Sequence, residues 1–162
     1  MTTTGERAED FALTGTQGEE IQTFRASEFA DGRPLLLAFY IYDFSPVCTD
    51  QMCEINDMEL LTVNDDVAVL GVSPDGPYSH KRFIDEEDIS YPLLYDPDLR
   101  VYDRFEFTRD ENPSHKRGIV LLDADFTVRY RWEASDDEHH EWSVGTLNEA
   151  NGVARELVSG TD

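Results

Sequence analysis

Two cysteines, Cys48 and Cys53, are the only thiols in this chain, and they lie five positions apart. Ser45 is a favoured N-cap residue and Pro46 suits the first helical position, so a helix is predicted to begin here. Cys48 then takes the third helical position, near unpaired backbone N–H groups and the positive end of the helix dipole. Because these surroundings favour the thiolate, which is the nucleophilic form, the pattern predicts thiol chemistry at Cys48.

Other roles for the two cysteines have less support from their surroundings. A free cysteine is often a small buried hydrophobe, but the cap, the proline and the second thiol favour a reactive role for Cys48. A zinc pair is not favoured, because side chains at i and i+5 diverge on a helix and lack the close spacing of a zinc knuckle. The CxxC motif of dithiol oxidoreductases is absent from the sequence.

Histidines and acidic clusters are the remaining candidates for metal binding. The histidines are isolated, apart from one adjacent pair whose side chains would point apart on a helix; they are His80, His115, His139 and His140. The acidic runs at 96–98 and 136–138 are predicted to be solvated turns. We therefore expect neither a metal nor a cofactor.

The charge of the chain is strongly negative. Its 162 residues include 35 acidic and 13 basic ones, for a formal net charge of −22, and lysine occurs only at Lys81 and Lys116. Such a chain repels nucleic acid and anionic membranes, so neither is expected as a partner. Dispersed acids and scarce lysine favour the surface of a halophile's protein, which molar salt would screen, over an ordinary acidic mesophile protein. The N-terminus has no basic or apolar region typical of a secretory signal, so a cytoplasmic location is expected.

The apolar pattern predicts one α/β domain over residues 1–162, with a central sheet flanked by helices. No repeat or linker interrupts it. An N-terminal hairpin is predicted around Gly15 and Gly18, and a further strand at Phe126–Trp132. Buried strands are predicted at Leu35–Ile41, Val67–Val72 and Gly118–Leu122, and helical segments at Ala26–Phe29, Pro46–Leu61, Ser79–Glu86, Leu99–Phe105 and Glu138–Val158.

With these elements placed, the chain resembles a peroxiredoxin of the AhpC/TSA type, in the bacterioferritin comigratory protein or peroxiredoxin Q group. Three blocks carry the resemblance, in the family's order. They are the opening G-x-x-A-x-D-F-x-L at 5–13, the active-site loop FYIYDFSPVCT at 39–49, and LGVS with D, SH and F at 70–83. Arg117, three residues before Val120, stands where the family has its active-site arginine.

The resemblance implies a thioredoxin-like fold and the reduction of hydrogen peroxide and organic hydroperoxides. Cys48 would be the peroxidatic cysteine, Ser45 the Thr/Ser of the P-x-x-x-[TS]-x-x-C motif, and Cys53 the resolving cysteine. Arg117 would depress the pKa of the Cys48 thiol and stabilise charge on the leaving oxygen. The chain departs from the motif at Ile41, where the family has proline.

The resemblance also implies an intramolecular disulfide between Cys48 and Cys53, reduced by a thioredoxin-like dithiol. On a continuous helix, residues five apart have Cα atoms roughly 8–9 Å apart. A disulfide needs about 7 Å or less, so the helix is expected to unwind locally before the bond forms.

Two other functions on the same fold remain open from the sequence. One is a general thiol-disulfide oxidoreductase, and the other is a redox sensor or holdase that binds a partner when oxidised. We expect a monomer or a weak homodimer.

Overall fold

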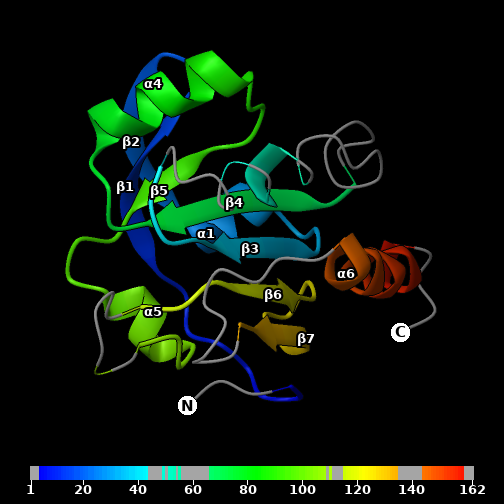
Figure 1. Ribbon diagram of the computed structural model, residues 1–162. Coiled ribbons are helices and arrows are strands. Elements are labelled where there is room, and N and C mark those ends of the chain that lie inside the picture. The colour runs from blue at the N-terminus through cyan, green and yellow to red at the C-terminus, as the bar shows by residue number, and fades with distance from the viewer. Residues whose placement is uncertain are drawn as a thin grey trace.

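The computed structural model describes residues 4–43, 49, 51–53, 55, 66–108, 110, 115–134 and 144–158. Within these residues, seven strands form one mixed sheet in the order β2-β1-β5-β4-β3-β6-β7 (Figure 1). The strands are β1 (Ala12–Gln17), β2 (Glu20–Arg25), β3 (Leu35–Phe39), β4 (Ala68–Ser73), β5 (Leu93–Tyr95), β6 (Gly118–Leu122) and β7 (Val128–Glu133). The predicted α/β class with a central mixed sheet is confirmed.

Helices cover both faces of the sheet. The described helices are α1 (Ala26–Ala30), α4 (Pro77–Glu87), α5 (Arg100–Arg104) and α6 (Val144–Val158). Thr49, Gln51, Met52, Cys53 and Ile55 are also helical, as a helix from Pro46 to Leu61 predicts; the rest of that prediction lies outside the described residues. Each of these helices is too short or too polar to span a bilayer.

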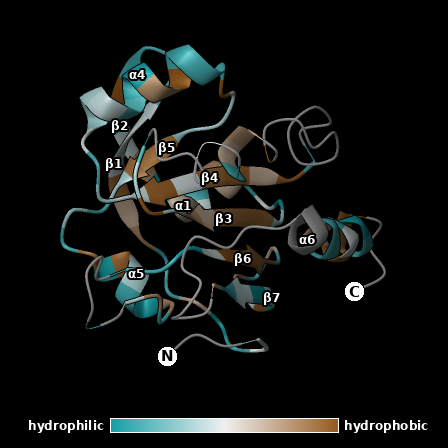
Figure 2. Cartoon of the chain, in the orientation of Figure 1, coloured by the Kyte–Doolittle hydropathy of each residue, from teal (hydrophilic) through white to brown (hydrophobic). Residues whose placement is uncertain are grey.

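The three apolar central strands bury both of their faces, which explains their unbroken runs of hydrophobic residues. In β3, Leu35, Leu37 and Phe39 join one core cluster with α1 and α5. The alternate residues Leu36 and Ala38 join a second cluster with α4, α6 and the helical segment around Met52. Figure 2 shows the brown, apolar central strands between helices whose ribbons mix teal and brown residues. The two clusters hold the helices, and thus their polar residues, in fixed positions over the sheet.

Most predicted elements are present with small differences at their ends. The hairpin is β1 and β2, and it joins the sheet through antiparallel pairing of β1 with β5. The strand predicted from Leu35 to Ile41 ends at Phe39, and residues 138–143 of the last predicted helix lie outside the described residues. β5 was not predicted, because its three residues directly follow Pro92, which is usually a sign of a loop.

The carboxyl ends of β3 and β4 and the start of β6 lie together along one edge of the sheet, here the edge that crosses the strand ends. β4 runs parallel to β3, so both strands end at this edge. β6 runs antiparallel to β3, and its first residue, Gly118, pairs with the last, Phe39. The residues that follow β3 therefore lie beside those that precede β6, although nearly 80 positions separate them. Chain segments at the carboxyl ends of such strands commonly carry functional sites.

Candidate active site

The candidate site is built around the chain that leaves β3. Tyr40, Ile41, Tyr42 and Asp43 follow the strand directly and lead into the predicted loop and helix start. Ser45 and Cys48, the predicted N-cap residue and nucleophile, lie outside the described residues. The described part of the site consists of the residues that follow β3 and of the side chains that contact them.

Arg117 is fully buried at this edge, one residue before β6. Its Nη1 donates a hydrogen bond of 2.6 Å to Oε1 of Gln51, which is buried on the helical segment three residues after Cys48. An arginine side chain keeps its charge at any physiological pH. A positive charge inside the protein favours nearby anions, so an anionic group beside Gln51 would be stabilised here.

Asp43 is the centre of a buried hydrogen-bond network. Its Oδ1 accepts from the Tyr40 hydroxyl at 2.5 Å, and its Oδ2 accepts from Ser79 Oγ at 2.8 Å and lies 2.8 Å from His80 Nδ1. The Asp43 backbone N–H donates to Asp75 Oδ2 at 2.6 Å. These contacts join the end of β3 to the first turn of α4 and to the residues after β4, so the start of the predicted loop is held from two sides.

The partners of His80 fix where its protons lie. Nε2 is 3.0 Å from the Leu94 carbonyl oxygen, which can only accept, so Nε2 carries a proton. Nδ1 lies 2.8 Å from Oδ2 of the Asp43 carboxylate, which also accepts hydrogen bonds from the hydroxyls of Tyr40 and Ser79. Burial, and after it the charge of Asp43, raises the pKa of Tyr40 well above its ordinary value, so this hydroxyl remains a donor. The network thus keeps a stable set of protons beside the site.

Two further side chains bind the backbone at the end of β3. His115 is buried, and its Nε2 lies 2.8 Å from the carbonyl oxygen of Ile41. The Tyr102 hydroxyl lies 2.6 Å from the carbonyl oxygens of both Tyr40 and Val72. Ile41, where the motif has proline, is itself buried in the second core cluster. Packing and hydrogen bonds therefore restrain a segment whose backbone lacks a proline.

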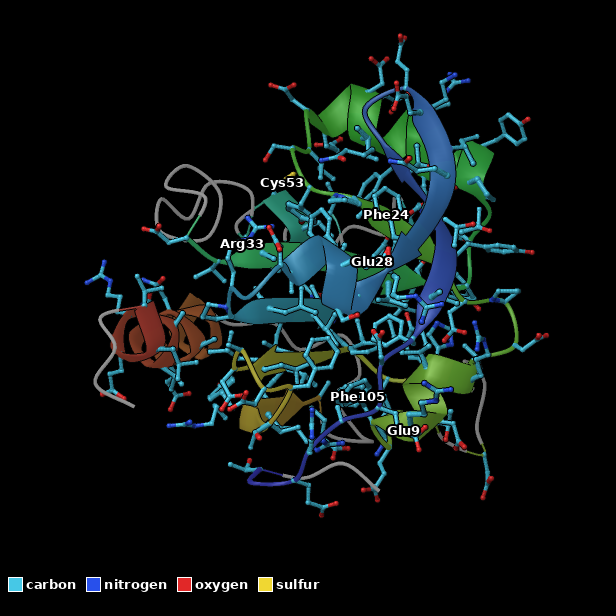
Figure 3. All side chains as sticks on the ribbon, turned by 180° about the vertical axis from the view of Figure 1, so that it is seen from behind. Glu9, Phe24, Glu28, Arg33, Cys53 and Phe105 are labelled. Carbon is cyan, nitrogen blue, oxygen red and sulfur yellow. The ribbon has the colours of Figure 1, made fainter. Side chains whose placement is uncertain are left out.

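Cys53 is half-buried on the helical segment that also carries Gln51. Its Sγ lies 3.5 Å from Oε1 of Glu87, the last residue of α4. The preceding residue is fixed as well, because the Tyr91 hydroxyl donates to the Met52 carbonyl oxygen at 2.7 Å. Figure 3 shows the Cys53 sulfur near the chain that leaves α4. The predicted resolving thiol thus belongs to the helix that also contacts Arg117.

Sequence reasoning found some of these residues and missed others. The predicted Arg117 and Cys53 lie on elements that Gln51 joins, whereas Cys48 and Ser45 lie outside the described residues. Gln51 and the Asp43–His80 pair were not predicted as site residues. His80 had no visible partner in the sequence, because Asp43 is 37 positions away and only the parallel β3–β4 arrangement brings the two together.

The part of the chain that the structure describes contains no cluster of side chains suited to bind a metal ion. Among those residues, no group of three or more His, Cys, Asp and Glu side chains is arranged to hold an ion. His80 and His115 instead use their ring nitrogens in buried hydrogen bonds to protein oxygens. His139 and His140 lie outside the described residues.

Comparison with known proteins gives consistent results. A profile described as the AhpC/TSA family matches residues 4–131. Peroxiredoxin Bcp of Bacillus subtilis (strain 168) is 30% identical over 142 residues, covering 84% of this chain and 88% of that relative. Peroxiredoxin Bcp of Escherichia coli (strain K12) is 28% identical over 152 residues, covering 90% of this chain and 95% of that relative.

Solved structures share the fold at lower identity. Peroxidoxin BcpB from Mycobacterium tuberculosis superposes with a TM-score of 0.80 at 24% identity, covering 97% of this chain and 99% of that one. AhpC from Enterococcus faecalis gives a TM-score of 0.83 at 20% identity, covering 100% of this chain and 98% of that one. Identities this low show a shared architecture and say nothing of individual residues.

Proposed function

This chain belongs to the AhpC/TSA family and is a thiol-dependent peroxidase of thioredoxin-like fold, and we propose that Cys48 is the thiol that attacks the peroxide. The observation that carries this assignment is the fully buried Arg117 held by Gln51 at the edge where β3 ends. A permanent positive charge at that edge is what a nucleophilic thiolate requires. The sequence supplies a thiol there, at the predicted third position of the helix that carries Gln51.

In the proposed first step, the Cys48 thiolate attacks one peroxide oxygen. An S–O bond forms, the O–O bond breaks, and Cys48 becomes a sulfenic acid. The second oxygen leaves as hydroxide or alkoxide and takes a proton to become water or an alcohol. Arg117 favours the thiolate beforehand and stabilises the negative charge that develops on the leaving oxygen. The Ser45 hydroxyl and the Cys48 backbone N–H are proposed to donate to the peroxide oxygens.

In the proposed second step, Cys53 attacks the sulfenic acid and forms a disulfide within one chain. The helical distance between the two residues is too long for a disulfide, so the segment between them must unwind first. A thioredoxin-like dithiol would then reduce the bond by exchange. An intramolecular disulfide is compatible with the monomer or weak homodimer expected from the sequence.

Peroxide consumption driven by thioredoxin and its reductase tests this proposal. We expect turnover with the unaltered chain, none with Cys48→Ser, and a single turnover with Cys53→Ser that leaves a dimedone-reactive sulfenic acid. Dimedone labelling confined to Cys53, or unchanged turnover by Cys48→Ser, would overturn the assignment. A disulfide-linked dimer through Cys48 on a non-reducing gel would remove the resolving role of Cys53.

A further inference from the structure

The last residue of α4 contacts the second thiol of the chain. Glu87 Oε1 lies 3.5 Å from Cys53 Sγ, a distance at which a thiol donates a weak hydrogen bond to a carboxylate. Both side chains are half-buried, so water screens this contact less than it would at the surface. Figure 3 shows this thiol beside the chain that leaves α4.

Glu87 differs from the acidic residues around it. Asp85, Glu86 and Asp88 are exposed, and Glu86 pairs with Arg82 at 3.3 Å on the outer side of the helix. Glu87 is the half-buried member of this acidic run and the one whose carboxylate meets a thiol. The contact therefore does not follow from the general abundance of acid in this chain.

A second contact holds the same turn of helix. The buried Tyr91, four residues beyond Glu87, donates its hydroxyl proton to the Met52 carbonyl oxygen at 2.7 Å. Burial, and after it the charge that Cys53 would carry as a thiolate, raises the pKa of Tyr91 well above its ordinary value. Glu87 thus offers Cys53 a carboxylate acceptor, and Tyr91 brings a phenol that stays protonated near the same thiol.

We propose that Glu87 is a latch on the resolving thiol, holding Cys53 protonated and docked against α4 and so setting the rate of disulfide formation. This inference rests on the proposed resolving role of Cys53. A negative oxygen beside a thiol favours the neutral S–H over the thiolate, and the thiolate is the better nucleophile. The Cys53–Glu87 contact must therefore break before Cys53 can reach Cys48.

The step that the latch controls, disulfide formation, needs no reagent beyond the Cys53 thiol and the Cys48 sulfenic acid. Cys53 sulfur bonds to Cys48 sulfur as the S–O bond of the sulfenic acid breaks. The departing hydroxide takes the proton that Cys53 gives up and leaves as water. The slower this step, the longer the sulfenic acid persists, and the more often a second peroxide can oxidise it to the sulfinic acid. Glu87 thus acts as a positioning residue that sets sensitivity to over-oxidation.

Quenched-flow measurement separates the two chemical steps. Samples are stopped at intervals after peroxide is added, remaining thiols are alkylated, and the sulfenic and disulfide forms are measured by mass. For Glu87→Gln we expect the peroxide-dependent first phase to stay within twofold and the second phase to become roughly tenfold faster. Glu86→Gln is the matched control, because it removes the same charge one residue away without touching Cys53, and it should leave both phases unchanged.

A second readout separates the loss of charge from a structural effect. In the Cys48→Ser background, alkylation of Cys53 by iodoacetamide is followed against pH. Glu87→Gln should move the profile to lower pH and raise the alkylation rate at neutral pH, whereas Glu86→Gln should not. Urea unfolding of both glutamine variants verifies that the fold is retained.

The outcomes distinguish this inference from the function on which it rests. If Glu87→Gln and Glu86→Gln give the same second phase and the same alkylation profile, the latch does not exist. A slower second phase for Glu87→Gln would also overturn it, because Glu87 would then act as a base that activates Cys53. If Cys53→Ser keeps a second phase that ends in an intramolecular product, the resolving assignment itself fails.

Discussion

Asp43 links three segments of the chain through its buried carboxylate and its backbone N–H. The carboxylate accepts from Tyr40 and contacts His80 in buried bonds, and it accepts from Ser79 in a partly buried one. A carboxylate in such a place depends on its donors, since a buried charge without them is strongly unfavourable. The network therefore fixes the chain only two residues before Ser45.

Tyr40→Phe tests this network with the loss of a single oxygen atom. The Asp43 carboxylate would lose one buried donor, so we expect the free energy of unfolding to fall by about 1–3 kcal/mol. Tyr78→Phe is the matched control, because Tyr78 is 79% exposed and should lose almost nothing. Urea unfolding measures both variants. Equal stabilities would show that the Tyr40 hydroxyl does not support the Asp43 carboxylate.

The catalytic role of Arg117 is best tested with a substitution that keeps its positive charge. Because the side chain is fully buried, Arg117→Ala would leave a cavity and confuse catalysis with stability. Arg117→Lys retains the charge but loses the planar fork that reaches Gln51. We expect the second-order rate constant for sulfenic acid formation to fall by roughly 10²-fold, the effect of removing one positioned donor. A rate within threefold of the unaltered chain would assign Arg117 a structural role.

Some of these residues were predicted from the sequence and others were not, and the difference has a physical reason. Arg117 and Cys53 were identified by their places relative to motifs, which are local features of the chain. Asp43 and His80 both lie in the quoted motif blocks, but their pairing depends on a contact across 37 positions, which no local pattern indicates. Residues whose role comes from tertiary contacts need the fold before they can be recognised.

Among the secondary-structure elements, the start of β6 matters most for the site, since it places Arg117. Gly118 has no side chain where the Phe107 ring packs, and a Cβ built there would meet that ring. Phe107 is fully buried, lies 4.9 Å from the Phe39 ring and receives the Arg131 guanidinium at 4.5 Å. The ring is packed against these neighbours, so making room for a Cβ at residue 118 would displace them.

Gly118→Ala should therefore destabilise the protein by about 1–3 kcal/mol through overpacking. Gly152→Ala is a useful contrast within α6, where nothing beyond the neighbouring residues and the helix's own backbone lies within 4 Å of the added carbon. There alanine should stabilise the protein by roughly 0.5–1 kcal/mol, because glycine is a poor residue for a helix interior. Thermal unfolding measures the two shifts. Shifts of the same sign would contradict this description of the two backbones.

The elements themselves were largely predictable, because hydrophobic periodicity is a property of the sequence. The three central strands follow from apolar runs, and the helix predicted over Ser79–Glu86 is α4, which begins two residues earlier at Pro77. β5 was not predicted from the sequence, because a strand of three residues depends on its neighbours in the sheet. It pairs with β1 on one side and with β4 on the other. No local pattern of that length could have indicated this double pairing.

At the scale of the whole molecule, negative charge dominates. Salt bridges use a few of the acidic residues, such as Glu133 with Lys116 and Arg131, and Asp123 with Arg129. Burial alone would raise the pKa of Glu133, but its two cationic partners outweigh that effect and leave the pKa below its ordinary value. With 35 acidic residues against 13 basic ones, acidic groups far outnumber basic ones, and the excess negative charges repel one another across the surface.

This imbalance predicts that salt stabilises the fold. Raising KCl from low to molar concentration shortens the Debye length from about 30 Å at 0.01 M to about 3 Å at 1 M, which removes most of the repulsion between exposed carboxylates. The same salt weakens the surface ion pairs, but each of these contributes only about 0–1 kcal/mol to stability. At a net charge of −22, the stability gained from reduced repulsion should exceed this loss. We therefore expect the melting temperature to rise across this range, by about 2–4 °C for each kcal/mol gained.

Sucrose at matched osmolality is the control, because it does not screen charge. A melting temperature that stays flat or falls in KCl would show that self-repulsion does not limit the stability of this protein.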